Sequence, residues 1–554
     1  MQATNSKVEK KKSERQYYID ALRVLAVLLL ILFHSSRVFD LGEDWNVYNE
    51  QTSRIVNLFQ NLFHPWHMQL FILLAGSGAW FALRKRSGRQ YTAERFLRIF
   101  LPLLFGMFLI QSPLQLYIYR LQRHQFDGNF LQFLPTYYTT GPAIGYKGNL
   151  SPEHLWFLIY LFIIAMAALP LLKYLRGEKG QARIDRWATL AGNRAWLLLI
   201  PPLPIVVSQL VLLRIFPWET HAIVDDWAYI VYLFLFFIYG AILMSDKRFT
   251  KAVANSWKPA LLLAAGVWIY NYSGVIDFGQ NEILGFLWLY VATFGTWFWL
   301  VALLGLGKTF LDKPSKLLSH FSEIAYPYYI WHQTVIVVLA YFVVRLEAGI
   351  LVKYLLIAVP AAVITWALSV AVKWTNVTRF LFGMKTSWNI STQTALRIGS
   401  AGLVFFLVVL VLAFAVPVDN PQTTNFPTPQ TIATPAETVN RVSGATYIFD
   451  DNRNGWKAMT LTFEQDRAAI QLVFEDKSSD YAIGFDGQYL PNGDGTVETT
   501  GFWRSDEDFV VYFRQGDHRE IWDIKFGDDG ELLFRIRDGV EVVLWVRLTG
   551  ARQG

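Results

Sequence analysis

The sequence predicts a polytopic α-helical membrane protein with about eleven transmembrane helices, followed by a soluble antiparallel β domain at its C-terminal end. Long apolar runs recur from residue 18 to residue 417, and short polar stretches separate them, as expected of membrane-spanning helices. Beyond residue 438 the pattern changes to short alternating runs, separated by Asp-Gly and Asn-Gly pairs that are typical of hairpin turns. The chain therefore divides into a membrane part and a separate β domain.

The apolar runs define the expected elements in order. Eleven spans are expected, at about 18–39, 64–83, 99–119, 154–175, 195–215, 227–245, 258–273, 283–306, 322–345, 351–373 and 399–417. We assign residues 1–398 to a membrane domain of ten helices, and residues 399–417 to the eleventh helix. A Pro- and Thr-rich linker is expected at 418–438, and the β domain at 439–554.

Loop charges predict the orientation of the spans, because Lys and Arg concentrate in cytoplasmic loops. Basic residues crowd the N-terminal segment 7–15 and the loop 84–98, whereas the loop 40–61 between them is acidic. We therefore expect the N-terminus to be cytoplasmic, and eleven spans then make the C-terminal domain extracytoplasmic. Counted over 440–554, that domain holds about 13 Lys and Arg against about 21 Asp and Glu, so its charge is opposite to that of the membrane part.

Composition excludes several classes of function. The 554-residue chain contains no cysteine, which removes thiol nucleophiles, disulfides and thiolate metal sites. Its net charge of +6 comes from cytoplasmic loops and does not predict nucleic-acid binding.

Three ionisable residues, Asp20, Arg23 and His34, lie inside the first apolar run. A charged group in the hydrocarbon core costs about 2.5–3.5 kcal/mol on insertion scales, so such groups usually face a cavity or one another. Asp20 and Arg23 are three residues apart and can pair on one helix face. His34 lies about three turns beyond Arg23, on nearly the same face and roughly 16 Å along the axis. We predict a polar stripe that carries an ion pair and a deep imidazole; a purely structural pair is the alternative.

Four further segments place polar residues at the ends of spans or inside them. They are His64-Pro65-Trp66-His67, Glu94 to Arg98, His154-Leu155-Trp156-Phe157, and Tyr326 to His332. His332 is expected about as deep as His34 and is reached from the same side, where the arginines of the second segment lie. Each segment also has a structural interpretation: helix-to-helix hydrogen bonds, interfacial aromatic residues, or ordinary cytoplasmic charges. Their coincidence favours a tunnel through the membrane.

Such a tunnel is suited to acyl transfer. A neutral imidazole can take a proton from a sugar hydroxyl as the hydroxyl attacks a thioester. An anionic donor such as coenzyme A needs cations for its phosphates, and the guanidinium group of arginine matches phosphate geometry.

Several of these segments resemble the acyltransferase-3 family of bacterial membrane acyltransferases. Arg23, ten intervening residues and His34 are similar to its Arg-x10-His signature, and Arg95-Phe96-Leu97-Arg98 to its Arg-x-x-Arg motif. The stretch His67 to Gly76 resembles its second-helix motif, and Tyr326 to His332 its late-helix Tyr-x-x-Tyr-x-x-His motif. The resemblance covers residues 17 to about 375.

Within that family the chain most resembles the glucan succinyltransferase-like members, through His154-Leu155-Trp156-Phe157 and Tyr326-Pro327-Tyr328. Two positions depart from the family pattern: Gln69 stands where Pro is common, and Ala325 where Ser is common.

The resemblance implies a membrane-bound enzyme of the bacterial cytoplasmic membrane. It would move an acyl group from cytoplasmic acyl-CoA to a hydroxyl of an extracytoplasmic glycan or glycolipid, and no metal is expected. We expect catalytic roles for His34, Asp20, Arg23 and His332, donor binding by Arg95 and Arg98, and substrate binding by His67, His154, Trp156 and Tyr329.

Two other functions stay open from the sequence. One is a proton-coupled transporter or flippase, in which the buried Asp, Arg and His relay protons. The other is a sensor whose β domain binds a ligand. Within the β domain, Phe502-Trp503-Arg504-Ser505-Asp506 suggests an aromatic face for sugar, with a core position for Trp503 as the alternative. The domain's expected role is to hold the acceptor, with no chemistry of its own.

Overall fold

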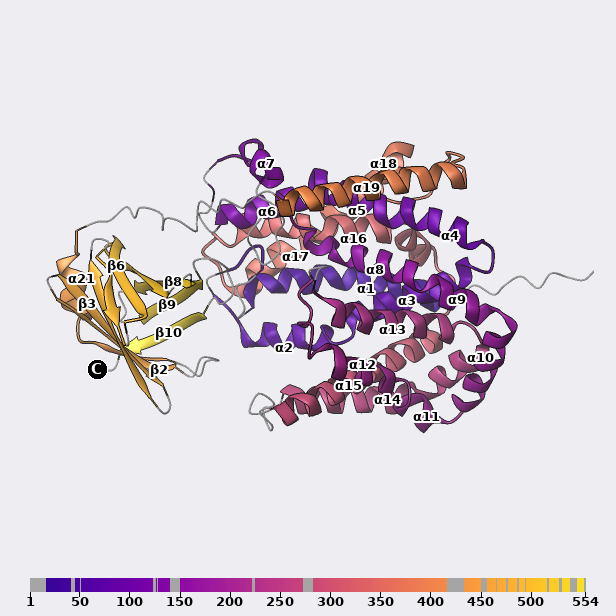
Figure 1. The fold of residues 1–554 in the computed structure, drawn as a ribbon, viewed down its shortest axis with the longest axis horizontal. Helices are drawn as coiled ribbons and strands as arrows, with labels where there is room; N and C mark the ends of the chain where they lie inside the picture. Colours follow the sequence, from indigo (N-terminus) through magenta and orange to yellow (C-terminus); the bar gives the residue numbers. More distant parts are fainter. Residues whose placement is uncertain are drawn as a thin grey trace, which may run out of the picture. The chain divides into compact units, whose positions relative to one another are not determined.

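The architecture is that of a computed structural model, and the chain divides into two compact units (Figure 1). One unit comprises Met1–Ser36, Ile55–Ser112 and Pro152–Phe406; the other comprises Arg37–Arg54, Pro113–Ser151 and Leu407–Gly554. The structure describes residues 16–552 except 41–44, 50, 123–125, 127, 140–149, 222–224, 273–281, 416–432, 450–455, 465, 475–476, 486–487, 494, 516–517, 528–530 and 539–545.

The first unit is built of helices. Its helices are α1 Tyr17–Ser36, α2 Arg54–Phe63, α3 His67–Ala82, α4 Gly88–Arg95, η2 Phe96–Phe100, α5 Leu101–Phe105, η3 Gly106–Ile110, η5 Glu153–Leu155, α8 Trp156–Ala167, α9 Leu169–Arg176, α10 Glu178–Leu190, α11 Arg194–Leu199, α12 Pro202–Leu212, α13 Trp227–Leu243, α14 Lys247–Tyr272, α15 Glu282–Phe310, α16 Lys316–Val343, α17 Ile350–Ala371, η6 Val372–Trp374 and α18 Asn376–Leu381. The second unit contributes η1 Arg37–Phe39 and α7 Phe130–Thr139, and α6 Gln111–Gln122 and α19 Thr392–Ala415 cross the division between the two units.

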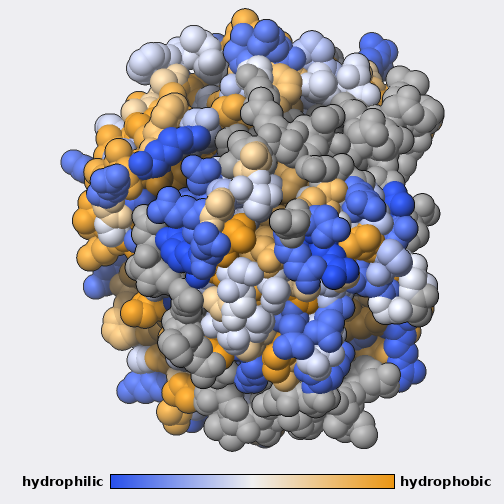
Figure 2. Space-filling view, turned by 90° about the vertical axis from the view of Figure 1, so that its left-hand side faces the viewer, coloured by the Kyte–Doolittle hydropathy of each residue, from blue (hydrophilic) through white to orange (hydrophobic). Residues whose placement is uncertain are grey.

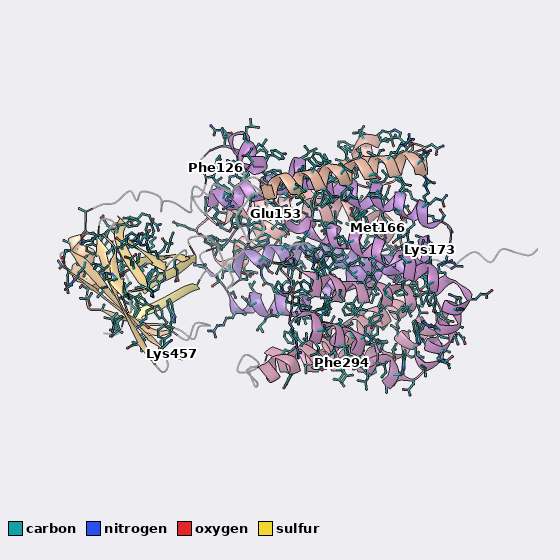
Figure 3. All side chains as sticks on the ribbon, in the orientation of Figure 1. Phe126, Glu153, Met166, Lys173, Phe294 and Lys457 are labelled. Carbon is teal, nitrogen blue, oxygen red and sulfur yellow. The ribbon has the colours of Figure 1, made fainter. Side chains whose placement is uncertain are left out.

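Several of these helices make the chain a membrane protein. Among the described residues, six helical stretches are long and apolar enough to cross a membrane, or up to eight if each of two bent helix pairs is one span. One bent pair, α8 with α9, runs from Glu153 past Met166 to Lys173 and bends by 44° (Figure 3). The expected count of eleven is therefore not confirmed. Large apolar side chains such as Leu262, Leu351 and Val404 are exposed on these helices, as expected of surfaces that face lipid.

Two glycines bring α3 and α13 into backbone contact. A Cβ atom added at Gly76 of α3 would overlap the carbonyl oxygen of Phe237, and one added at Gly240 of α13 would overlap that of Leu73. The Ser77 hydroxyl lies 3.1 Å from Gly240 O and donates to it across the same crossing. Small residues permit such close crossings between membrane helices. Gly76, at the end of the second-helix motif, is therefore required by packing.

The long helical stretch from Gly88 to Gln122 contains two π-helical segments, η2 and η3. Ser87 caps its start: the Ser87 hydroxyl accepts from Gln90 N–H, and the Gln90 side chain accepts from Ser87 N–H. A π-helical turn inserts a residue and shifts the faces of the helix that follow it. Arg95 and Arg98 lie at the beginning of this irregular region.

The C-terminal domain begins with a short helix, α21 Ala436–Val442, which overlaps the end of the segment expected to be linker, and continues as ten strands. They are β1 Thr446–Phe449, β2 Trp456–Phe463, β3 Arg467–Phe474, β4 Ser478–Phe485, β5 Leu490–Asn492, β6 Val497–Ser505, β7 Asp508–Gln515, β8 His518–Phe526, β9 Glu531–Asp538 and β10 Val546–Arg552. The predicted β domain is thus confirmed. The predicted turns Asp486-Gly487 and Asp529-Gly530, and most of the predicted linker, lie outside the described residues.

The strands form one sheet in the order β4-β3-β2-β1-β10-β9-β8-β7-β6-β5. Sequential neighbours pair antiparallel, as in the register Ile470↔Tyr481 of β3 and β4. β4 also pairs in parallel with β6, Gly484 facing Thr500, so the pairings close into a ring with β5 on its edge. This closure leaves only short free edges, which protects an antiparallel sheet from aggregation.

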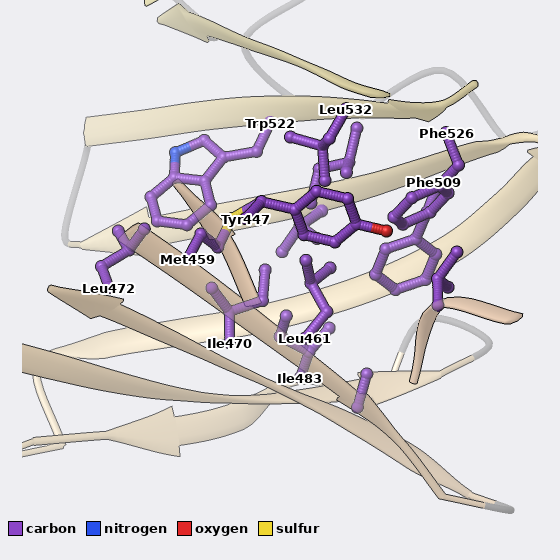
Figure 4. Close-up of a cluster of buried hydrophobic side chains, with 14 of the residues drawn as sticks. Tyr447, Met459, Leu461, Ile470, Leu472, Ile483, Phe509, Trp522, Phe526 and Leu532 are labelled. Atoms are coloured by element: carbon purple, nitrogen blue, oxygen red, sulfur yellow. The ribbon is translucent and has the colours of Figure 1, made fainter. Parts of the chain in front are cut away.

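Aromatic and aliphatic side chains fill the interior of this domain (Figure 4). Trp503 belongs to that core: it is 2% exposed, and its ring lies 5.3 Å from Phe463 and 5.1 Å from Phe509. Successive side chains of β6 point to opposite faces: Trp503 belongs to the large core cluster, and Phe502 to a smaller cluster on the other face. An exposed sugar-binding face that includes Trp503 is therefore wrong, and the core interpretation holds. On the face drawn in Figure 2, hydrophilic and hydrophobic residues are intermingled.

Candidate active site

Two histidines from helices far apart in sequence meet in the first unit. His34 is near the end of α1 and His332 is in the middle of α16, and these two helices pack against each other. His34 Nδ1 lies 3.2 Å from His332 Nε2, and the ring centroids are 5.0 Å apart. His332 is fully buried, whereas His34 is half-buried. The structure thus brings together the two deep histidines predicted from the sequence.

The neighbours of this pair determine which ring nitrogens carry hydrogen. His332 Nδ1 is 2.5 Å from the carbonyl oxygen of Tyr329, which can only accept, so Nδ1 carries the hydrogen and donates. In a neutral ring, His332 Nε2 is then an acceptor. His34 Nδ1 lies 3.2 Å from the Leu30 carbonyl oxygen, a second acceptor. His34 Nδ1 therefore carries a hydrogen, and His34 Nε2 is the basic nitrogen of the pair.

His154 ties η5 to α16 beside the pair. Its Nε2 lies 3.0 Å from Ile330 O and donates to it, while the Tyr329 hydroxyl donates to His154 O at 2.6 Å. The His154 ring centroid is 5.2 Å from that of His332. These two reciprocal bonds fix one turn of α16. The carbonyl group of Tyr329, in that turn, accepts the hydrogen bond from His332. Glu153, just before His154, has a φ of 48°, a conformation that costs energy for a residue with a side chain.

His67 joins α3 to α1 on the other side. It is buried, and its Nε2 lies 2.9 Å from Ala26 O of α1. Its ring contacts Phe33, at 6.2 Å between centroids, and Phe33 contacts His34 at 5.3 Å. His67 is therefore one aromatic ring away from His34.

A ladder of rings leads from the histidines toward the arginines. Tyr326, Tyr329 and His332 are three residues apart along α16, so they share one face. The Tyr326 and Tyr329 rings are nearly parallel with centroids 6.5 Å apart, and Tyr329 lies 5.7 Å from His332. Beyond Tyr326, Arg95 and Arg98 surround Glu94: Arg98 Nε is 3.2 Å and Arg95 Nη2 is 3.7 Å from its carboxylate.

The predicted pair of Asp20 and Arg23 forms, with Arg23 Nη2 2.7 Å from Asp20 Oδ1. The Arg23 side chain is 43% exposed, and the pair lies near the start of α1, roughly 16 Å along the axis from His34. It therefore does not contribute to the geometry of the histidine pair.

Trp156 lies in a second cluster that sequence reasoning missed. Its ring stacks on His221 at 4.0 Å, and His221 Nε2 lies 3.6 Å from Glu219. Glu219 also faces His64 at 3.5 Å, so it bridges two histidines. Glu219 and His221 both have positive φ, 54° and 57°. The sequence feature that could have indicated this cluster is the acidic loop before α13. Its charge predicts on which side of the membrane the loop lies, but it does not by itself predict a cluster of side chains.

The two acids of this loop have opposite shifts in pKa. Burial alone would raise the pKa of Glu219, but the nearby side chains of His221 and His64 lower it below its ordinary value. Burial raises the pKa of Asp226, whose carboxylate accepts from the Tyr160 hydroxyl at 2.6 Å and from His221 N–H at 3.0 Å. These bonds hold the loop against α8.

The described residues contain no group of three or more His, Cys, Asp or Glu that could hold a metal ion.

Comparisons with known proteins bear on this arrangement. A family model described as an acyltransferase domain matches residues 16–374, well over half of the chain. The chain is also similar to Glucans biosynthesis protein C of Escherichia coli strain K12, strain SMS-3-5 / SECEC and O1:K1 / APEC. Each is 24% identical over 177 residues, which are 30% of this chain and 41% of the relative. The chain thus spans about two fifths of the length of these curated relatives.

Proposed function

The chain belongs to the acyltransferase family whose domain model covers residues 16–374 and is therefore an acyltransferase, and we propose that it moves an acyl group from cytoplasmic acyl-CoA to a hydroxyl of an extracytoplasmic glycan or glycolipid. The observation that carries this proposal is the bonded pair His34 and His332, with the basic nitrogen on His34. The name of the similar relatives, Glucans biosynthesis protein C, supports a glycan acceptor.

His34 acts as the general base in this reaction. Its Nε2 takes the proton from the acceptor hydroxyl, and the hydroxyl oxygen attacks the carbonyl carbon of the thioester. The new carbon–oxygen bond forms a tetrahedral intermediate, and the carbon–sulfur bond then breaks. The leaving thiolate takes the proton back from His34, so the products are an ester and a free thiol.

His332 orients the base. Its Nε2 accepts from His34 Nδ1–H and stabilises the imidazolium that forms when His34 takes the proton, as the buried acid does in a catalytic triad. His332 is fixed in turn by its bond to Tyr329 O, and Tyr329 is held by His154. His154 and Tyr329 then act by positioning the pair, and His67 braces α1.

Arg95 and Arg98 receive the phosphates of the donor. Three guanidinium groups, those of Arg86, Arg95 and Arg98, surround the single carboxylate of Glu94, which leaves two net positive charges. A guanidinium group pairs well with phosphate oxygens. The ladder from Tyr326 to His332 is the path for the acyl arm. Trp156, in the cluster with His221, is on the acceptor side, and Asp20 with Arg23 supports the donor side of α1.

We place the enzyme in the bacterial cytoplasmic membrane, with a cytoplasmic N-terminus and an extracytoplasmic β domain that holds the acceptor. The filled core of that domain supports a binding role through its surface rather than an internal cavity. Removing residues from about 419 onward should leave coenzyme A binding intact and lower transfer to the native acceptor. Loss of coenzyme A binding would contradict this division of roles.

The acylation of the surface glycan tests the main proposal. Cells that produce the wild-type chain, the His34→Ala variant or no protein are compared by mass spectrometry of the glycan. His34→Ala should lower acylation by roughly 100- to 10,000-fold, the usual effect of losing a general base. The matched control is His320→Ala. His320 is on α16 but away from the pair, where its ring contacts Trp366, and its loss should not change acylation. Wild-type acylation in His34→Ala cells would refute the assignment.

A further inference from the structure

Helix α10 lies at one end of the helical unit, between α9 and α11 (Figure 1). It follows the candidate span made by α8 and α9, and it precedes the candidate span that begins at Arg194. Five of its 13 residues are charged, so α10 is too short and too polar to cross a membrane. A helix of this kind between two spans lies along the surface of the bilayer, at the border between lipid and water.

Two of the three faces of α10 are already occupied. The buried stripe recurs every four residues and consists of Gly180, Ile184 and Ala188. At 100° per residue, the two acids of the helix, Glu178 and Asp185, both lie on one flank of this stripe. Arg248 of α14 covers that flank: it donates to Asp185 Oδ1 at 2.7 Å and to the Thr189 hydroxyl at 3.2 Å. The acidic flank is therefore tied to a neighbouring helix.

The other flank carries all the basic residues of α10. Lys179, Arg183 and Arg186 fall on the side of the helix away from both acids, and all three are exposed. Within the part of the chain that the structure describes, no carboxylate pairs with any of them. Arg183 instead places its guanidinium carbon 5.4 Å from the centre of the Tyr174 ring. We call these three residues the basic flank of α10.

Apolar side chains accompany the basic flank. Leu190, on the same side of α10, is 43% exposed, and Tyr174 at the end of α9 is 38% exposed. Trp187 is half-buried between the basic flank and the buried stripe. Basic side chains mixed with aromatic and aliphatic ones are typical of helices that lie in the membrane interface. The exposed side of α10 thus suits a surface that is both anionic and partly apolar.

Gly180 fixes the direction in which the basic flank points. A Cβ atom at Gly180 would overlap the carbonyl oxygen of Tyr174 and the Cα atom of Leu175, so α10 packs backbone to backbone against the end of α9. The bonds of Arg248 hold α10 from the opposite side. The helix therefore cannot turn its basic flank inward, and a ligand of this flank meets a surface that is already ordered.

We propose that the basic flank of α10 binds the headgroup of an anionic phospholipid of the surrounding bilayer. Its guanidinium and ammonium groups can donate to phosphate oxygens. The acyl chains of the same lipid would lie along the next span, whose Leu199 is 49% exposed. Each Lys or Arg near an anionic membrane surface contributes roughly fivefold to the affinity. This lipid site goes beyond the proposed acyl transfer and does not depend on it.

The test places a fluorescent label beside the basic flank. The chain contains no cysteine, so Leu190→Cys supplies a single labelling position. The labelled full chain is placed in nanodiscs of neutral lipid that contain a small fraction of quencher lipid, which carries a nitroxide high on one acyl chain. The headgroup of the quencher lipid is either phosphatidylglycerol, which is anionic, or phosphatidylcholine. Phosphatidylglycerol should half-quench the label at a roughly tenfold lower mole fraction, because the basic flank attracts it.

Variants of the labelled chain identify the residues that bind. Lys179→Gln/Arg183→Gln/Arg186→Gln should abolish the difference between the two quencher lipids. Arg183→Lys/Arg186→Lys keeps the charges and should keep most of the difference. The triple variant should melt at the wild-type temperature in neutral lipid, because its three side chains are exposed.

The matched control removes three exposed charges from other loops of the same unit. It is Lys313→Gln/Lys316→Gln/Lys385→Gln, and it should keep the full difference between the two lipids. An equal loss in this control would show a general effect of net charge and would overturn the site on α10.

Three other outcomes would also overturn the proposal. One is equal quenching by the two lipids when the basic flank is intact. Another is recovery of fluorescence on adding excess coenzyme A, which would assign the flank to a soluble phosphate compound. If the triple variant does not fold, Arg186→Gln alone decides: it should narrow the difference by roughly fivefold, and an unchanged difference would rule out the lipid site.

Discussion

Replacing His332 by alanine separates the base from the residue that orients it. The hydrogen on His34 Nδ1 has two acceptors, Leu30 O and His332 Nε2, each at 3.2 Å. Alanine removes one acceptor and leaves the other, so His34 keeps both its imidazole and its tautomer. One net hydrogen bond contributes about 0.5–1.5 kcal/mol, which corresponds to a fall in rate by a factor of roughly 2 to 13. Loss of His34 should cost far more, roughly 100- to 10,000-fold.

The assay measures the release of free thiol from acyl-CoA by the purified full chain in the presence of the glycan acceptor. The rate at saturating donor is compared for the wild type, His332→Ala, His332→Gln and His34→Ala. Glutamine should recover part of the loss, because its amide oxygen can accept from His34 Nδ1–H. Donor affinity should stay unchanged in all four proteins, since neither histidine lies at the arginine cluster.

The order of these rates decides the roles. If His332→Ala lost as much activity as His34→Ala, His332 would itself handle the transferred proton, and the assignment of His34 Nε2 as the base would be refuted. If His332→Gln were no better than His332→Ala, the acceptor role of His332 Nε2 would be refuted instead. His320→Ala remains the control for an imidazole on α16 that lies outside the site.

Three other predictions follow from the packing, the charges and the topology. Gly240→Ala should destabilise the protein by about 1–3 kcal/mol, measured by thermal unfolding in detergent, because the new methyl group meets the carbonyl of Leu73, whereas Gly266→Ala, with open space around it, should not. The pKa of Glu219 is lowered, so its carboxylate contributes to stability above its unfolded pKa of about 4.3, and this contribution is lost as pH falls through the folded value. Glu219→Gln should therefore lower the melting temperature at about pH 7 and change it least near about pH 3, and an equal loss at both would contradict the ion pair. A reporter that is active only outside the cytoplasm should be active when fused after Gly554, and activity of a cytoplasmic reporter there would mean that the span count is wrong by one.

The positions of the two histidines along their helices could be predicted from the sequence, because they depend on local spacing within single helices. Their bond could not, because His34 and His332 are 298 residues apart and meet only through the packing of α1 on α16. The pair of Asp20 and Arg23 was predictable for the same local reason, and it forms. The distance from this ion pair to His34 also follows from the helical rise. Residues on one face of a helix therefore need not belong to one site.

Other features needed the three-dimensional arrangement. The side chain of Trp503 in β6 points into the core, as do those of Phe509 and Phe513 in β7. This shared direction can be recognised only when the register of β6 and β7 is known. The cluster of Glu219, His221 and Trp156 joins a loop to the start of α8, which no spacing in the sequence indicates. The count of eleven spans is not confirmed among the described residues, where two helix pairs are bent; such bends do not follow from apolar length alone.

The crossing of α3 and α13 has a consequence for motion. Where two backbones touch at Gly76 and Gly240, neither helix can slide or rotate against the other without overlap, so the two move as one rigid body. His67 extends this body to α1 through its bond to Ala26 O. On the other side of the histidine pair, α16 is joined to η5 by the bonds of Tyr329 and Ile330 with His154, which are single hydrogen bonds that can break and reform. The helix that carries His34 is thus tied to the α3–α13 crossing, whereas the turn that orients His332 is tied only by these bonds.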